Sequence, residues 1–85
     1  MRQFILYSRA YCHLCDELLS ALEVLQAECR FSVDVVDVDT DEALVAQYDE
    51  LVPVLMGRED DGELLQLCHY HFDEIAVRSF LFDDH

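Results

Sequence analysis

The sequence predicts an α/β domain whose elements follow one another in the order β-α-β-α-β-β-α. Three observations carry this prediction. A continuous apolar strand is followed directly by an amphipathic helical pattern, a second β-branched strand comes next, and two further apolar runs flank the hairpin signal Asp61-Gly62. The chain has 85 residues. One hydrophobic core fits in that length, so we expect residues 1–85 to form a single domain.

The first half of the chain carries a strand, a helix and a second strand. Residues 4–7 are apolar without a break, which is typical of a strand buried on both faces. From Cys12 to Leu25, leucine and alanine recur at helical spacing, and the helix is expected to end near Glu28. Valines alternate with polar residues over residues 31–38, as in a β-branched strand. A strand, helix, strand sequence predicts a right-handed parallel crossover.

The second half adds a short helix, a hairpin and a last helix. Asp39 is expected to cap the short helix, with Glu42 at the acidic position of a capping box. Residues 52–56 form a strand whose proline lies at its start, and residues 64–68 form the return strand of an antiparallel hairpin. Apolar residues at helical spacing over residues 72–80 mark the last helix. A mixed four-stranded sheet with helices on both faces is the economical packing.

Composition and charge exclude several classes of protein. Hydrophobic residues make up 53% of the chain and Gly plus Pro total three, which excludes a disordered or low-complexity chain. Five arginines, no lysine and nineteen acidic residues give a net charge of −14. That field repels phosphate, so we expect no binding to nucleic acid or to an anionic membrane. No apolar run suits a signal peptide or a membrane helix, and we expect a cytoplasmic monomer with reduced thiols.

The motif that carries chemistry is Cys12-x-x-Cys15, placed where the first helix begins after the first strand. A C-x-x-C at a helix start favours thiol–disulfide exchange, because unpaired amide N–H groups there stabilise a thiolate. Cys12 is expected to be the exposed attacking thiol. Cys15 lies one turn inside the helix, where it can resolve a mixed disulfide. A zinc site or a structural pair is the weaker alternative for these two cysteines.

These features together resemble glutaredoxin in a minimal thioredoxin fold. The resemblance rests on Tyr11-Cys12-x-x-Cys15 after the first strand, on Val52-Pro53 before the third strand, and on the order of the elements, and it covers nearly the whole chain. The chain is similar in particular to short bacterial glutaredoxin-like proteins. The resemblance implies a thiol–disulfide oxidoreductase of the dithiol type, with Cys12 as nucleophile and Cys15 as resolving thiol. It also implies a cis Val52–Pro53 bond that places the backbone of residue 52 beside the disulfide, where it pairs with an extended substrate.

The resemblance further implies which residues bind the substrate. Arg9 stands where a basic residue often helps to bind glutathione, and Tyr11 would form a wall of the groove. Asp73 matches the acidic end of the glycine-rich turn that holds the γ-glutamyl carboxylate of glutathione, a turn that residues 68–72 replace here. His13 stands where the family usually has proline, and we expect it to be exposed and to tune the redox poise. The expected partner is a disulfide-bearing protein or glutathione, with no tightly bound cofactor and with glutathione as a candidate reductant.

A second group of chemically active residues is Cys68, His69 and His71. The hairpin brings them to the proline end of the third strand in either of two registers, with Pro53 opposite Cys68 or opposite Tyr70. We therefore expect Cys68, with the two histidines, at the rim of the same site. The alternative is that Cys68 points into the core.

Two rival functions stay open at this stage. Cys68-x-x-His71 has zinc-like spacing, so the chain could be a metal or iron–sulfur module that uses Cys12 with glutathione or with Cys68 and His71. It could also be a redox-inert interaction module with a thioredoxin fold. Asp37, Asp39 and Asp41 resemble a calcium ladder, but no glycine or distant glutamate completes the loop, which favours a strand end and a helix cap.

Overall fold

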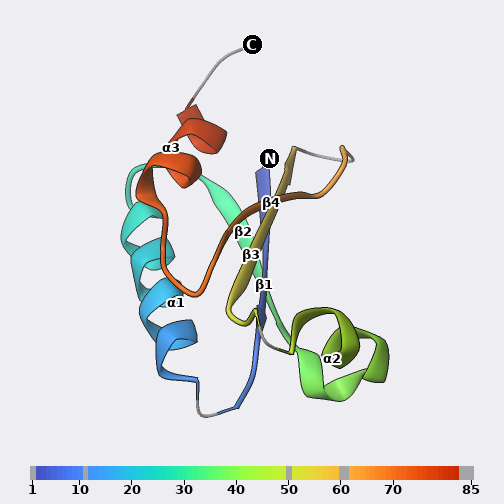
Figure 1. Cartoon of the computed structure of the whole chain (residues 1–85). Helices are drawn as coiled ribbons and strands as arrows, with labels where there is room; N and C mark the ends of the chain where they lie inside the picture. Colours follow the sequence, from blue (N-terminus) through green and yellow to red (C-terminus); the bar gives the residue numbers. More distant parts are fainter. Residues whose placement is uncertain (1, 11, 50, 60–61, 83–85) are drawn as a thin grey trace.

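The computed structural model describes residues 2–10, 12–49, 51–59 and 62–82. Its elements, shown in Figure 1, follow the predicted order with one added 3-10 helix. They are β1 (Arg2–Ser8), α1 (His13–Leu25), β2 (Phe31–Asp37), η1 (Val38–Thr40), α2 (Glu42–Tyr48), β3 (Val54–Glu59), β4 (Leu65–His69) and α3 (Glu74–Phe82). Within the described residues, no helix has the length and apolar character needed to cross a membrane.

The strands form one mixed sheet in the order β2-β1-β3-β4. β1 runs parallel to β2 and antiparallel to β3, and β3 and β4 form the antiparallel hairpin. The register pairs Ser8 with Asp37, Tyr7 with Val54, and Val54 with His69. The ends of β1, β2 and β4 therefore meet the start of β3 at one end of the sheet, which we call the site end.

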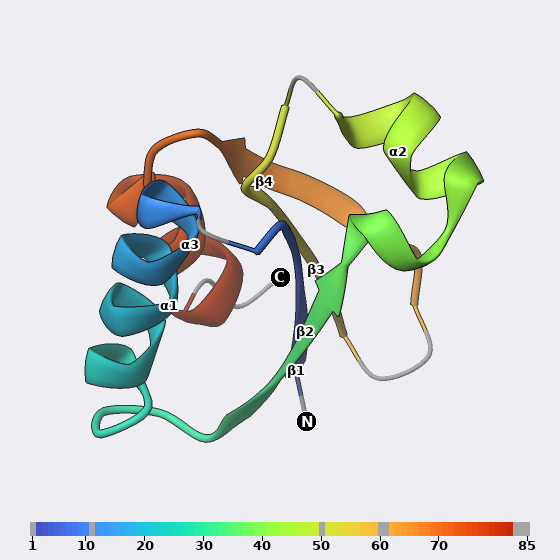
Figure 2. The same ribbon diagram turned by 90° about the horizontal axis from the view of Figure 1, so that it is seen from below.

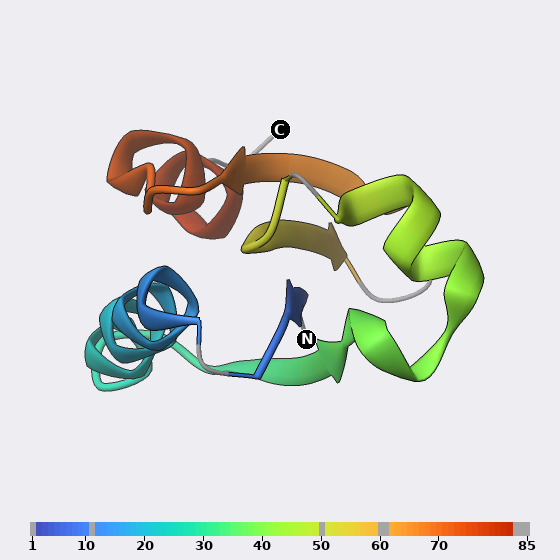
Figure 3. The ribbon, with the colours of Figure 1, turned by 60° about the horizontal axis from the view of Figure 1, so that its bottom comes forward.

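Helices cover both faces of the sheet, as predicted. Figures 2 and 3 show α1 and α3 on one face and α2 on the other. The larger core lies under α1 and α3, and its buried residues are Phe4, Leu6, Leu18, Leu22, Leu25, Phe31, Leu55, Cys68, Val77 and Leu81. The smaller core, on the side of α2, contains Val38, Tyr48 and Val54. On this side the rings of Tyr7 and Tyr48 stack with their centroids 4.5 Å apart.

Gly57 sets how closely α3 approaches the sheet. A Cβ atom at this position would lie 2.9 Å from Leu67 Cδ1 and 3.0 Å from the ring of Phe80, both too close for a side chain. Any larger residue here would have to displace the Leu67 and Phe80 side chains, so glycine favours this close contact between β3 and α3 with no unusual backbone angle.

The start of α2 corrects the prediction that Asp39 caps this helix. Asp41 is the cap, because its Oδ1 accepts a hydrogen bond from the Ala43 amide at 2.9 Å, and Glu42 is the first helical residue instead of the third residue after the cap. The two residues before Asp41 belong to η1, which Asp37 caps by accepting from the Asp39 amide. The tight turn of η1 lets Val38 bury its side chain completely in the smaller core, which delays α2 by two residues.

The structure shows which of the two hairpin registers allowed by the sequence is formed. Val54 pairs with His69 and Leu55 with Cys68, and the Tyr70 amide donates to the Pro53 carbonyl at 2.9 Å. Tyr70 is thus opposite Pro53, and the register with Cys68 opposite Pro53 is wrong. An irregularity between Leu55 and Met56 shifts the pairing beyond this point. β3 also begins at Val54, two residues later than expected.

Candidate active site

Cys12 and Cys15 form a disulfide at the site end, with their Cα atoms 5.2 Å apart. Cys12 is the cap of α1: its backbone is extended and its Sγ accepts from the Cys15 amide at 3.1 Å. Cys15 is buried, on the helix face that also buries Leu18 and Leu22, whereas Cys12 is only half-buried. The two sulfurs therefore differ in access in the way that an attacking thiol and a resolving thiol require.

The helix start also determines the charges near Cys12. The Cys15 amide donates to Cys12 Sγ, and a helix start favours the negative form of a sulfur placed there. Asp16 lies in the first turn of α1 and Glu17 directly follows it, and both side chains are exposed. His13 is exposed as expected, and its Nε2 lies 3.4 Å from Glu17 Oε1. Its ring is thus placed against a carboxylate one turn along the helix.

The Val52–Pro53 peptide bond is cis, as the resemblance implies, and it lies at the same end of the sheet. Pro53 is buried and Val52 is half-buried. The Val52 amide donates to the Tyr48 carbonyl at 3.1 Å. The amide of Val52 is therefore already used by the end of α2.

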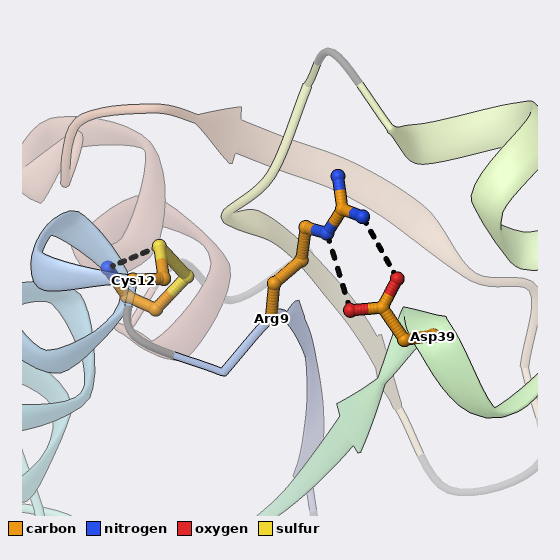
Figure 4. The surroundings of a disulfide bond; sticks show 4 residues. Arg9, Cys12 and Asp39 are labelled. Carbon is orange, nitrogen blue, oxygen red and sulfur yellow. Dashed lines mark hydrogen bonds and ion pairs between the residues drawn. A yellow bond between two sulfur atoms is a disulfide. The ribbon is translucent and has the colours of Figure 1, made fainter.

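Arg9 is held by two carboxylates from other elements. Its Nη2 lies 2.8 Å from Asp39 Oδ1 and its Nε lies 3.3 Å from Asp39 Oδ2, a two-pronged contact, while its Nη1 pairs with Asp49. The hydrogen bonds and charge of Asp39 raise the pKa of Arg9, which stays protonated. Figure 4 shows the Arg9 side chain directed toward Asp39 and away from the disulfide. The sequence had suggested Arg9 as a glutathione ligand, and the structure places its guanidinium in this pair of contacts.

Sequence reasoning missed Asp39 and Asp49 as partners of Arg9, although one signal for Asp39 was present. A parallel crossover sets the segment after β2 beside the segment after β1, as the pairing of Ser8 with Asp37 shows. Arg9 directly follows Ser8, and Asp39 lies two residues after Asp37. Asp49 lies forty residues from Arg9 and reaches it only because α2 folds back over the site end.

Cys68, His69, His71 and Asp73 lie together around a shallow hollow of about 680 Å³ between β4 and α3. Cys68 is 9% exposed and belongs to the larger core, and its burial raises the pKa of its thiol. The two histidines are exposed. Asp73 caps α3 by accepting from the Ala76 amide at 3.1 Å. The structure thus groups these four residues with one another.

The metal-binding alternative needs the cysteines and histidines to lie close together. Across the part of the chain that the structure describes, no three His, Cys, Asp or Glu side chains come together as a metal-binding group. The zinc arrangement that would join Cys68 and His71 to the first two cysteines is therefore not assembled among these residues. Tyr11, the expected wall of the groove, lies outside the described residues.

Comparison with known proteins finds one matching family and several similar solved structures. The chain matches the glutaredoxin-like domain family (DUF836) over residues 3–82. Among solved structures it is similar to the protein Ne2328 of Nitrosomonas europaea, with 36% identity over 94% of this chain and 91% of that one and a TM-score of 0.81. The protein XcR50 of X. campestris is also 36% identical, over 91% and 92% of the two chains, with a TM-score of 0.62.

A more distant likeness supports the fold alone. Mitochondrial thioredoxin 3 of Saccharomyces cerevisiae, in its oxidised form, shares 17% identity over 94% of this chain and 76% of its own, with a TM-score of 0.67. The chain therefore has the thioredoxin-like α/β fold that its motifs suggested. No protein of curated function matches the sequence.

Proposed function

Because the chain belongs to the glutaredoxin-like domain family, we propose that it is a thiol–disulfide oxidoreductase in which Cys12 is the nucleophile and Cys15 the resolving thiol. The observation that supports this most is the pairing of the two cysteines at the start of α1, one accessible and one buried. A purely structural disulfide has no need of this position, whereas a redox pair gains from it, because the amides of a helix start stabilise the thiolate.

The reaction proceeds in two exchanges. The Cys12 thiolate attacks one sulfur of a substrate disulfide, forms a mixed disulfide with it, and releases the other sulfur as a thiolate that takes up a proton. The Cys15 thiol then loses its proton and attacks Cys12 Sγ. This second exchange forms the Cys12–Cys15 disulfide and releases the second substrate thiol. The substrate gains two electrons and two protons, and a thiol reductant must return them to the protein.

The surroundings supply the binding surface in this proposal. The Val52 carbonyl would accept a hydrogen bond from an extended substrate, since the Val52 amide already donates to Tyr48, and Tyr11 and Asp73 would border the groove. His13, exposed between the two cysteines, would tune the redox poise. The substrate is a disulfide in a protein or in glutathione, and the reductant is glutathione or a dithiol protein. We propose that the protein acts as a monomer in the cytoplasm, without a tightly bound cofactor.

The test uses an uncharged disulfide so that chemistry alone is measured. The reduced protein is mixed with 2-hydroxyethyl disulfide, and released thiol and protein mass are followed. The wild type should end as the intramolecular disulfide, Cys15→Ser should stop as a mixed disulfide on Cys12, and Cys12→Ser should react far more slowly. Cys29→Ser, which changes a half-buried residue just past α1, serves as the matched control. Equal rates for the wild type and Cys12→Ser would contradict the proposal, and metal content of protein purified without oxygen would then test the metal alternative.

A further inference from the structure

We propose that the site selects disulfides flanked by positive charge, as in basic segments of proteins, over the anionic disulfide of glutathione. This inference rests on the proposed function and names its substrate class. Its first support is Arg9, which directly follows β1. Among the described residues of the segments that meet at the site end, Arg9 is the arginine. Asp39 holds its guanidinium with two contacts and Asp49 with one, so its charge is more than balanced before any substrate arrives.

The other arginines lie at the opposite end of the sheet. Arg2 pairs with Phe31 in the register and its side chain binds Glu59 at 2.8 Å. Arg58 is opposite Gln3, and Arg30 directly precedes Phe31. The fifth, Arg78, binds Glu28 just beyond the far end of α1 at 3.1 Å. None of these positions is near the helix start that carries Cys12.

The site end, in contrast, gathers carboxylates. Asp16 lies in the first turn of α1 and Glu17 directly follows it, Asp39 lies in η1 after β2, Asp49 ends α2, and Asp73 precedes α3. All five are exposed, so they act on an approaching reactant through solvent. Their field extends about one Debye length, roughly 8–10 Å at physiological salt. A cationic disulfide would be concentrated at Cys12, and glutathione disulfide, whose carboxylates outnumber its ammonium groups, would be repelled.

The test compares three small disulfides that differ in charge. Cystamine is cationic, 2-hydroxyethyl disulfide is neutral, and 3,3′-dithiodipropionate is anionic. Each rate of oxidation of the reduced protein is measured from about 10 mM to about 500 mM KCl, a range that shortens the Debye length severalfold. Each disulfide is compared with itself, so differences in leaving-group chemistry cancel.

We expect cystamine to slow by about tenfold over this range, the anionic disulfide to accelerate by a similar factor, and the neutral one to stay nearly constant. Glutathione disulfide, measured alongside, should follow the anionic probe. Similar salt dependence for all three probes would overturn the inference and leave the proposed function standing. Failure to oxidise the protein even with the neutral disulfide would overturn both.

A pair of double variants then separates the site end from the overall charge. Asp39→Asn with Asp49→Asn releases Arg9 and removes two negative charges at the site end. The Glu23→Gln, Glu63→Gln double variant removes one negative charge from α1 and one from the hairpin, both away from the disulfide. We expect the first variant to oxidise severalfold faster with the anionic disulfide and slower with cystamine, and the second to change far less. The neutral disulfide reports whether each variant is folded and active. An equal response from both variants would overturn the role of the Arg9 contacts.

Discussion

Cys68 shows how far a hairpin register determines the position of one side chain. The order of the strands predicts that Cys68 lies near the proline end of β3, and its pairing with Leu55 bears out that neighbourhood. The direction of the side chain depends on which face of the sheet it occupies, and a shift of one residue exchanges the faces. The irregularity at Leu55 and Met56 makes this shift possible without any signal in the sequence. Cys68 consequently shares the larger core with Leu55.

A prediction about thiol reactivity follows from this burial. Ionisation of Cys68 is disfavoured because burial raises its pKa, so alkylation requires both opening of the core and a higher pH. In the oxidised protein at neutral pH, iodoacetamide should modify half-buried Cys29 faster than Cys68 by about tenfold or more, as a local opening of ~1.4 kcal/mol would give. Peptide mass mapping over time measures the two rates, and unfolding in guanidinium should make them equal.

The raised pKa of Cys68 also determines in which direction the stability of the fold changes with pH. A folded-state thiol pKa above the unfolded value stabilises the fold fully below the unfolded pKa, and the contribution is lost as pH rises through the folded pKa. The urea midpoint should therefore fall above about pH 8.5. A Cys68→Val variant should show a smaller fall. A decline of the same size in the variant would show that other groups cause it.

At the scale of elements, the sequence predicts much of the architecture because the hydrophobic patterns are local. The continuous apolar run of β1, the helical spacing of α1 and the single proline before β3 each identify their element from a few residues. The start of α2 could not be assigned in this way. Three aspartates at alternate positions are each good caps, and the choice among them depends on burial of Val38 against Tyr48 and Val54. Likewise, the partners of Arg9 come from η1 and from the end of α2 once the sheet has formed.

The assignment of the α2 cap can be tested by two single variants. Asp41→Ala removes the hydrogen bond to the Ala43 amide, and loss of an N-cap costs about 0.5–2 kcal/mol of unfolding free energy. Asp39→Ala breaks the exposed ion pair with Arg9 and should cost less, since exposed pairs contribute little. Urea unfolding curves of the two variants give the comparison. A larger loss for Asp39→Ala would mean that the helix is capped as the sequence first suggested.

At the scale of the whole molecule, the net charge of −14 is unevenly distributed. Arg2 and Arg78 form ion pairs at the far end, while Arg9 at the site end lies among Asp39 and Asp49. The radius of gyration is 12.4 Å. The Debye length is about 30 Å at 10 mM salt and about 8 Å at 150 mM. At low salt, then, carboxylates across the whole fold repel one another, whereas at physiological salt the repulsion is mostly between neighbours.

We therefore expect added KCl to stabilise the fold. Unfolding separates the carboxylates, so the native state gains more from screening than the unfolded chain does. Exposed pairs such as Arg2–Glu59 and Arg78–Glu74 lose strength in the same range, but such pairs contribute little on their own. The urea midpoint should rise between about 10 mM and about 150 mM KCl. The Glu23→Gln, Glu63→Gln double variant should start from a higher midpoint and gain less. If the midpoint instead falls as salt is added, the ion pairs outweigh the repulsion, and the acidic surface is better matched to its arginines than the charge count suggests.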